Sequence, residues 1–75
     1  MWDKGTLLVD GTNVKYWVKH YAEPSEEYRI GGGRISKMEL RVGGRTTLNY
    51  DRGWDIEPED EASQLAYAVL MKQYN

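Results

Sequence analysis

One stretch of the chain, residues 58–74, has the apolar spacing of a helix, and it follows segments that alternate like strands. Five of its apolar side chains recur at the i, i+3, i+4, i+7 and i+8 positions, namely Ala62, Leu65, Ala66, Val69 and Leu70. Pro58 suits a first helical position, and residues 59–61 place carboxylates at the positive end of the helix dipole. Strands with one apolar face need a covering layer, and only this helix can supply it.

The segments before the helix have the pattern of four strands, at residues 5–9, 12–21, 35–42 and 45–50. Asp10 and Gly11, between the first two strands, indicate a two-residue hairpin turn that pairs Val9 with Thr12. This pairing places the apolar residues of both strands on one face, so the turn and the pattern agree on the same register.

The hairpin between residues 35–42 and 45–50 needs an irregular turn. A two-residue loop would put Leu48 on the face that carries the charged residues of the preceding strand. A three-residue loop, with a glycine in the left-handed region, pairs Val42 with Thr46 and brings Leu48 to the apolar face. We therefore expect the three-residue loop.

These patterns predict an α+β fold: an antiparallel four-stranded β-meander, covered on one face by a single C-terminal α-helix. Residues 28–30 are a candidate for a short extra strand, and residues 1–75 are expected to form a single domain. The predicted core consists of Leu7, Val9, Val14, Tyr16, Val18, Met38, Leu40, Val42, Leu48, Leu65, Ala66, Val69 and Leu70.

Composition argues against several kinds of protein. The 75 residues contain no cysteine, which excludes disulfides and thiolate metal sites. We find no signal peptide and no apolar run long enough to span a bilayer, so we expect a cytoplasmic protein without a membrane partner.

Catalytic chemistry has little support in the sequence. One histidine and no cysteine remove most nucleophile–base pairings, so we expect neither catalytic residues nor a cofactor. The carboxylates of residues 51–61 could bind a divalent cation. Capping and dipole complementation explain most of them without a metal, and we expect no metal site.

The face of the sheet turned away from the helix is the candidate binding surface, because nothing else in the chain remains to cover it. It is predicted to carry Lys15, Trp17, Lys19, Tyr21, Lys37 and Arg41, together with Thr47 and Asn49. Residues 28–52 hold six basic and two acidic residues, a net charge of +4, whereas residues 53–75 hold one basic and five acidic residues, a net charge of −4.

Exposed aromatic rings among cations suit a protein partner, since Trp, Tyr and Arg dominate interface hot spots. Nucleic acid is the alternative partner, through phosphate contacts and base stacking, although the acidic pI of about 5.3 argues against it. A further alternative is an ordinary solvated face on which lysine stems cover the aromatic rings.

Residues 49–55, Asn-Tyr-Asp-Arg-Gly-Trp-Asp, are the most distinctive short stretch. With the acidic helix start that follows, they resemble small uncharacterised proteins of phages and prophages in Gram-positive bacteria. The resemblance covers the second half of the chain and implies a mobile-element origin but no activity. We also expect Gly53 to take a positive φ and Trp54 to fold over the end of the core.

Self-association is expected as well, in the form of a homodimer. The predicted edge strands, residues 5–9 and 45–50, contain no proline and no inward charge to discourage pairing with another chain. A dimer that sets the basic face of one chain near acidic segments of the other would bury the exposed aromatic rings without bringing like charges together.

Overall fold

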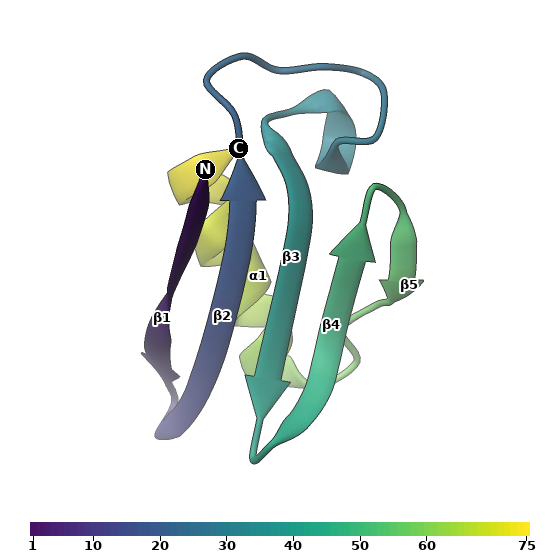
Figure 1. Ribbon diagram of the computed structural model, residues 1–75. Helices are drawn as coiled ribbons and strands as arrows, with labels where there is room; N and C mark the ends of the chain where they lie inside the picture. The colour runs from purple at the N-terminus through teal and green to yellow at the C-terminus, as the bar shows by residue number, and fades with distance from the viewer.

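The computed structural model describes residues 1–75 and contains one antiparallel sheet with one helix on one of its faces (Figure 1). The five strands are neighbours in chain order: β1 (Trp2–Val9), β2 (Thr12–His20), β3 (Ile35–Val42), β4 (Arg45–Asp51) and β5 (Trp54–Ile56). The helix α1 (Glu61–Tyr74) lies behind the sheet, and its C-terminal end lies near the N-terminus of the chain. The predicted α+β meander is confirmed.

The extra strand does not lie where the sequence suggested. Tyr28 and Arg29 form bends that lead into a 3₁₀ helix, η1 (Ile30–Gly32). Tyr28 has a φ of 59°, in the left-handed region, which is incompatible with a strand. The extra strand is β5, which pairs with Asn49 and Tyr50 of β4 and covers part of that edge of the sheet.

The turn between β4 and β5 also differs from the prediction. Arg52, and not Gly53, takes the positive φ, at 57°. The N–H of Asp51 donates to the carbonyl oxygen of Gly53 at 2.9 Å, and this hydrogen bond closes the turn. The chain therefore reverses without using the conformational freedom of the glycine.

The first hairpin has the predicted register, in which Val9 pairs with Thr12 and Leu7 with Val14. Asp10 and Gly11 both have positive φ, 48° and 78°, as the turn that matches the twist of two antiparallel strands requires.

The second hairpin has a two-residue turn, so the predicted three-residue loop is wrong. Val42 pairs with Arg45, and the register shifts further along, where Leu40 pairs with Leu48 and leaves Thr47 as the extra residue of a β-bulge. Leu48 is fully buried, so its predicted placement is right. The bulge in β4 corrects the register that the turn alone would have set.

The core lies between the sheet and the helix. Its buried members are Val14, Val18, Ile30, Ile35, Met38, Leu40, Leu48, Tyr50, Ala66 and Leu70. Four residues of the predicted core, Leu7, Val9, Tyr16 and Val42, pack against this cluster while only partly buried. The sequence did not single out Ile30 and Ile35 as core residues.

The predicted helix face is right for Ala66 and Leu70, but the helix is rotated toward Ser63, so the prediction for Leu65 and Val69 is wrong. Leu65 and Val69 are 42% and 47% exposed, whereas Ser63, Ala66 and Leu70 point to the core and are fully buried. The buried Ser63 hydroxyl lies 2.7 Å from the Thr47 hydroxyl. Thr47 therefore faces the helix, and its predicted place on the opposite face of the sheet is wrong.

The helix begins three residues later than Pro58, at Glu61, because Asp60 caps it. The Asp60 carboxylate accepts a hydrogen bond from the Ser63 N–H at 2.9 Å, which satisfies one of the unpaired donors of the first turn. Pro58 therefore lies before the helix.

Asn75 joins the end of the helix to the segment that precedes β3. Its side-chain oxygen accepts hydrogen bonds from the N–H groups of Arg34 and Ile35 at 2.8 and 3.0 Å, and its amide donates to the Ile30 carbonyl at 3.0 Å. Gly33 lies against this side chain, and a Cβ at residue 33 would collide with it. The loop of residues 21–34 is thereby held at one end of the sheet (Figure 1).

Candidate functional site

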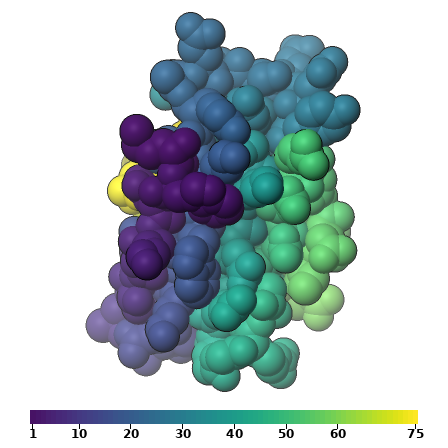
Figure 2. Space-filling model, viewed as in Figure 1, coloured from purple at the N-terminus to yellow at the C-terminus, as the bar shows by residue number.

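The face of the sheet turned away from α1 has no covering layer, and Figure 2 views the molecule from that side. We call it the outer face. Its cross-strand pairs are Trp2 with Lys19, Lys4 with Trp17, Lys15 with Arg41, Trp17 with Glu39, Lys19 with Lys37, Glu39 with Asn49, and Lys37 with Asp51. Five of the six predicted site residues lie in these pairs. The sixth, Tyr21, follows β2 directly and is 41% exposed.

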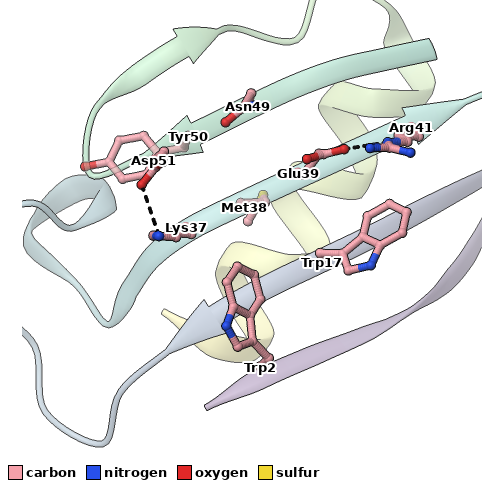
Figure 3. Close-up of a pocket in the computed structure, with 9 residues that line it drawn as sticks. All are labelled: Trp2, Trp17, Lys37, Met38, Glu39, Arg41, Asn49, Tyr50 and Asp51. Atoms are coloured by element: carbon pink, nitrogen blue, oxygen red, sulfur yellow. Dashed lines mark hydrogen bonds and ion pairs between the residues drawn. The ribbon is translucent and has the colours of Figure 1, made fainter.

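A pocket of about 410 Å³ lies on the outer face, and we call it the tryptophan pocket (Figure 3). Its lining residues are Trp2, Trp17, Lys37, Met38, Glu39, Arg41, Asn49, Tyr50 and Asp51. The indoles of Trp2 and Trp17 extend from β1 and β2 over the sheet on the side of the pocket away from β4 (Figure 3). The structure thus brings three predicted residues, Trp17, Lys37 and Arg41, into one pocket.

Trp2 is a residue that the sequence analysis missed. The predicted first strand began at Gly5, whereas β1 begins at Trp2 and continues the alternation that places Trp2 and Lys4 on the outer face. The indole of Trp2 is 54% exposed. Extending the alternation of the first strand toward the N-terminus would have found it.

Two of the predicted cations have carboxylate partners on the same face. Lys37 Nζ lies 3.5 Å from Asp51 Oδ1, and Arg41 Nε pairs with Glu39 Oε2 (Figure 3). Exposed pairs of this kind contribute little to stability, but they cancel charge locally. The tryptophan pocket is therefore mixed in charge.

Cations also lie over the aromatic rings. The Arg41 guanidinium carbon is 5.1 Å from the centre of the Trp17 ring. Lys19 Nζ is 5.9 Å from the centre of the Trp2 ring and 5.8 Å from that of Tyr21. Such cation–π contacts favour one ring orientation over others.

A second pocket, of about 360 Å³, lies where the loop of residues 21–34 meets the end of the sheet. We call it the basic pocket. It is lined by Lys19, Tyr21, Ser25, Glu27, Tyr28, Arg29, Ser36, Lys37 and Arg52. Lys37 lines both pockets, so the two adjoin.

Trp54, in the connector that the sequence analysis singled out, has a structural place. Its ring packs edge-on against Tyr50 of β4 and Tyr67 of α1, with centroid distances of 5.2 and 5.6 Å. Burial raises the pKa of both tyrosines. Trp54 thus links the sheet edge to the helix, as predicted for the end of the core, although 42% of it stays exposed.

The one histidine, His20, pairs with Asp3, with 3.3 Å between His20 Nε2 and Asp3 Oδ2. Its ring centroid lies 4.8 Å from that of Tyr74 at the end of α1. No three His, Cys, Asp or Glu side chains are grouped so that they could hold a metal ion. No helix is long and apolar enough to cross a membrane.

Comparison with known proteins gives one family. A family model described as a domain of unknown function (DUF7678) matches residues 1–75. No curated protein and no solved structure matches the chain.

Proposed function

We propose that the chain, which belongs to the DUF7678 family, is a non-enzymatic interaction protein that binds a protein partner through the outer face of its sheet. The partner's contact would centre on the tryptophan pocket. Around it lie the predicted binding residues Lys15, Trp17, Lys19, Tyr21, Lys37 and Arg41, to which the structure adds Trp2.

The observation that carries the proposal is the pair of indoles, Trp2 and Trp17, beside one pocket on an uncovered face. Tryptophan has a large apolar area to bury and is the residue type most enriched in interface hot spots. The cations that line the pocket already have carboxylates beside them, so the pocket has no net charge to attract a polyanion. A mixed-charge pocket with aromatic walls suits the side chains of another protein.

A pair of matched variants tests this. Trp17→Ala/Arg41→Glu removes a large apolar side chain and reverses a charge on the outer face. Leu65→Ala/Lys72→Glu makes the same kinds of change on the opposite side of the molecule, at exposed positions of α1. Proteins captured from a host lysate by the wild type and by the helix variant should be lost with the outer-face variant. The same captured set with both variants would contradict the proposal.

Nucleic acid is a second candidate partner, favoured by the cation–π pairs on the outer face. Base–aromatic stacking and phosphate contacts use the same residue types, and Trp2 leaves half of its surface open. Binding of labelled single-stranded or duplex DNA would weaken steeply between low and moderate salt. No binding at low salt would eliminate this candidate.

We also propose a homodimer. Because β5 pairs only with Asn49 and Tyr50 of β4, both sides of the sheet keep an open edge, and the longer one is β1, with eight residues. Its unpaired backbone groups can pair with a second copy, although Asp3, which faces inward and pairs with His20, is a feature that discourages such pairing. Sedimentation equilibrium should give a dimer mass, and a monomer mass at the highest concentration would refute this.

A phage or mobile-element origin remains part of the proposal. It rests on the resemblance of residues 49–55 alone. A gene neighbourhood without phage genes, in every genome that encodes the chain, would contradict it.

A further inference from the structure

Four cations line the basic pocket: Lys19, Arg29, Lys37 and Arg52. One lining carboxylate, Glu27, and Asp51 near the rim oppose them. Asp51 Oδ1 lies 3.5 Å from Lys37 Nζ and 3.9 Å from Arg52 Nε, so this carboxylate pairs with both cations. The four ion pairs of the structure involve neither Lys19 nor Arg29. The pocket thus keeps two cations without carboxylate partners.

Arg29 carries an unsatisfied hydrogen-bond donor. Its Nη1 is buried from solvent and has no hydrogen-bond partner. A buried donor of this kind is rare in folded proteins and costly, because a charged N–H loses its water without gaining an acceptor. The guanidinium carbon lies over the Tyr21 ring, 4.3 Å from the ring centre, so the arginine is held beside the pocket wall.

The backbone around the pocket is unusual as well. Only three non-glycine residues of the chain have a positive φ, and two of them, Tyr28 and Arg52, line this pocket. The left-handed region is unfavourable for side chains as bulky as these, and such residues cluster at ligand-binding sites. The Arg52 guanidinium carbon lies 6.0 Å from the centre of the Tyr28 ring, so the two strained residues are neighbours across the pocket wall.

Tyr21 responds to the positive charge. A hydrogen bond with Lys19 lowers the pKa of its phenol, and the charges of Lys19 and Arg29 lower it further. The direction of this shift agrees with the positive charge of the pocket.

We propose that the basic pocket binds a phosphate dianion, either as the free ion or as a monoester. Two unpaired cations match its two negative charges, and Arg29 offers the planar donor geometry that phosphate oxygens accept. Ser25 and the phenols of Tyr21 and Tyr28 supply hydroxyl donors around it, whereas the Ser36 hydroxyl already donates to the Lys19 carbonyl oxygen. A carboxylate has one charge and two oxygens, so it would leave part of this donor set unused.

The test is an NMR titration of the backbone amides of the whole chain, at a pH above 7 where a monoester is mostly dianionic. Inorganic phosphate and phenyl phosphate are the probes, and acetate at equal ionic strength is the comparison. We expect saturable shifts for the pocket residues with both phosphates and none with acetate. Tighter binding of phenyl phosphate, whose ring could stack on Tyr28, would identify a monoester, and equal or weaker binding would identify the free ion.

Two charge-matched variants make the test specific. Arg29→Gln removes the unsatisfied donor and should weaken phosphate binding about tenfold, as expected when one charged hydrogen bond is lost. Arg34→Gln removes the same charge from an exposed residue of the same loop that does not line the pocket, and should leave the affinity within about twofold. If Arg29→Gln perturbs the fold, Lys19→Gln provides the same comparison.

The proposal is overturned if phosphate gives no saturable shifts in the pocket, if acetate binds as well, or if the two arginine variants weaken binding equally. It does not depend on the protein-binding proposal. Trp17→Ala/Arg41→Glu leaves the lining of the basic pocket unchanged, so loss of one activity can be told from loss of the other.

Discussion

Leu70 and Leu65 provide a test of the helix orientation, because they are the same residue type in the same helix with opposite exposure. Leu70 is fully buried in the core and Leu65 is 42% exposed. Truncating a fully buried leucine to alanine costs about 2–5 kcal/mol, from lost burial and the cavity left behind. The same change at Leu65 removes a side chain that water already reaches, and alanine is the better helix former, so the cost should stay below about 1 kcal/mol.

The effect at Leu70 is large for a domain of this size. Stabilities of roughly 0.05–0.15 kcal/mol per residue give a free energy of unfolding of about 4–11 kcal/mol for 75 residues. Urea unfolding followed by tryptophan fluorescence and far-ultraviolet circular dichroism would measure both variants. With a slope of about 1 kcal/mol per molar urea, a loss of about 3 kcal/mol lowers the midpoint by about 3 M. The midpoint of Leu65→Ala should fall by less than about 1 M.

If Leu70→Ala is too unstable to purify, Leu70→Met keeps the volume and should cost less than about 1.5 kcal/mol. Equal midpoint shifts for Leu70→Ala and Leu65→Ala, or a larger shift for Leu65→Ala, would refute the rotation of α1 about its own axis.

Three further changes have expected outcomes. Asp60→Ala removes the cap of α1 and should lower the free energy of unfolding by about 1 kcal/mol in urea melts, whereas Asp60→Ser, which can still accept from Ser63, should cost less. Asn75→Ala loses three side-chain hydrogen bonds and should lower the free energy of unfolding by about 1–3 kcal/mol. Amide hydrogen exchange of Arg34 and Ile35 should become faster, and unchanged exchange would contradict the role of Asn75. Burial, with hydrogen bonds to Tyr16 and Asp3, raises the pKa of Tyr74 to about 12, above the ordinary 10.0. The contribution of this tyrosine to the free energy of unfolding is therefore complete below pH 10 and is lost as the pH rises toward 12. Tyr74→Phe should reduce that loss in alkaline unfolding titrations.

Features that depend on neighbours in the sequence were predictable. Asp10 and Gly11 set the first hairpin because both tolerate a positive φ, and the turn then fixes every cross-strand pair of β1 and β2. Alternation along β2 and β3 placed Trp17, Lys37 and Arg41 on the face away from the helix. The helix itself was predictable from its spacing, although its rotation was not.

The rotation of α1 was settled by contacts with the sheet. Apolar side chains surround so much of this helix that the spacing fits two adjacent stripes that share Ala66 and Leu70, one including Leu65 and one turned toward Ser63. The hydrogen bond between Ser63 and Thr47 favours the second stripe, and Thr47 faces the helix because of a bulge in β4 that no local pattern announces. A polar residue in the core was thus decisive where hydrophobicity left a choice.

The candidate sites also depend partly on local sequence patterns and partly on contacts between distant residues. The sequence by itself determined which residues of β2 and β3 face away from the helix, because side-chain direction alternates with a period of two. Only the tertiary structure decided that Asp51 would neutralise Lys37, and that Asn75 would hold the loop of residues 21–34 against the sheet and so form the basic pocket. Such contacts join residues far apart in the chain, and local propensity carries no information about them.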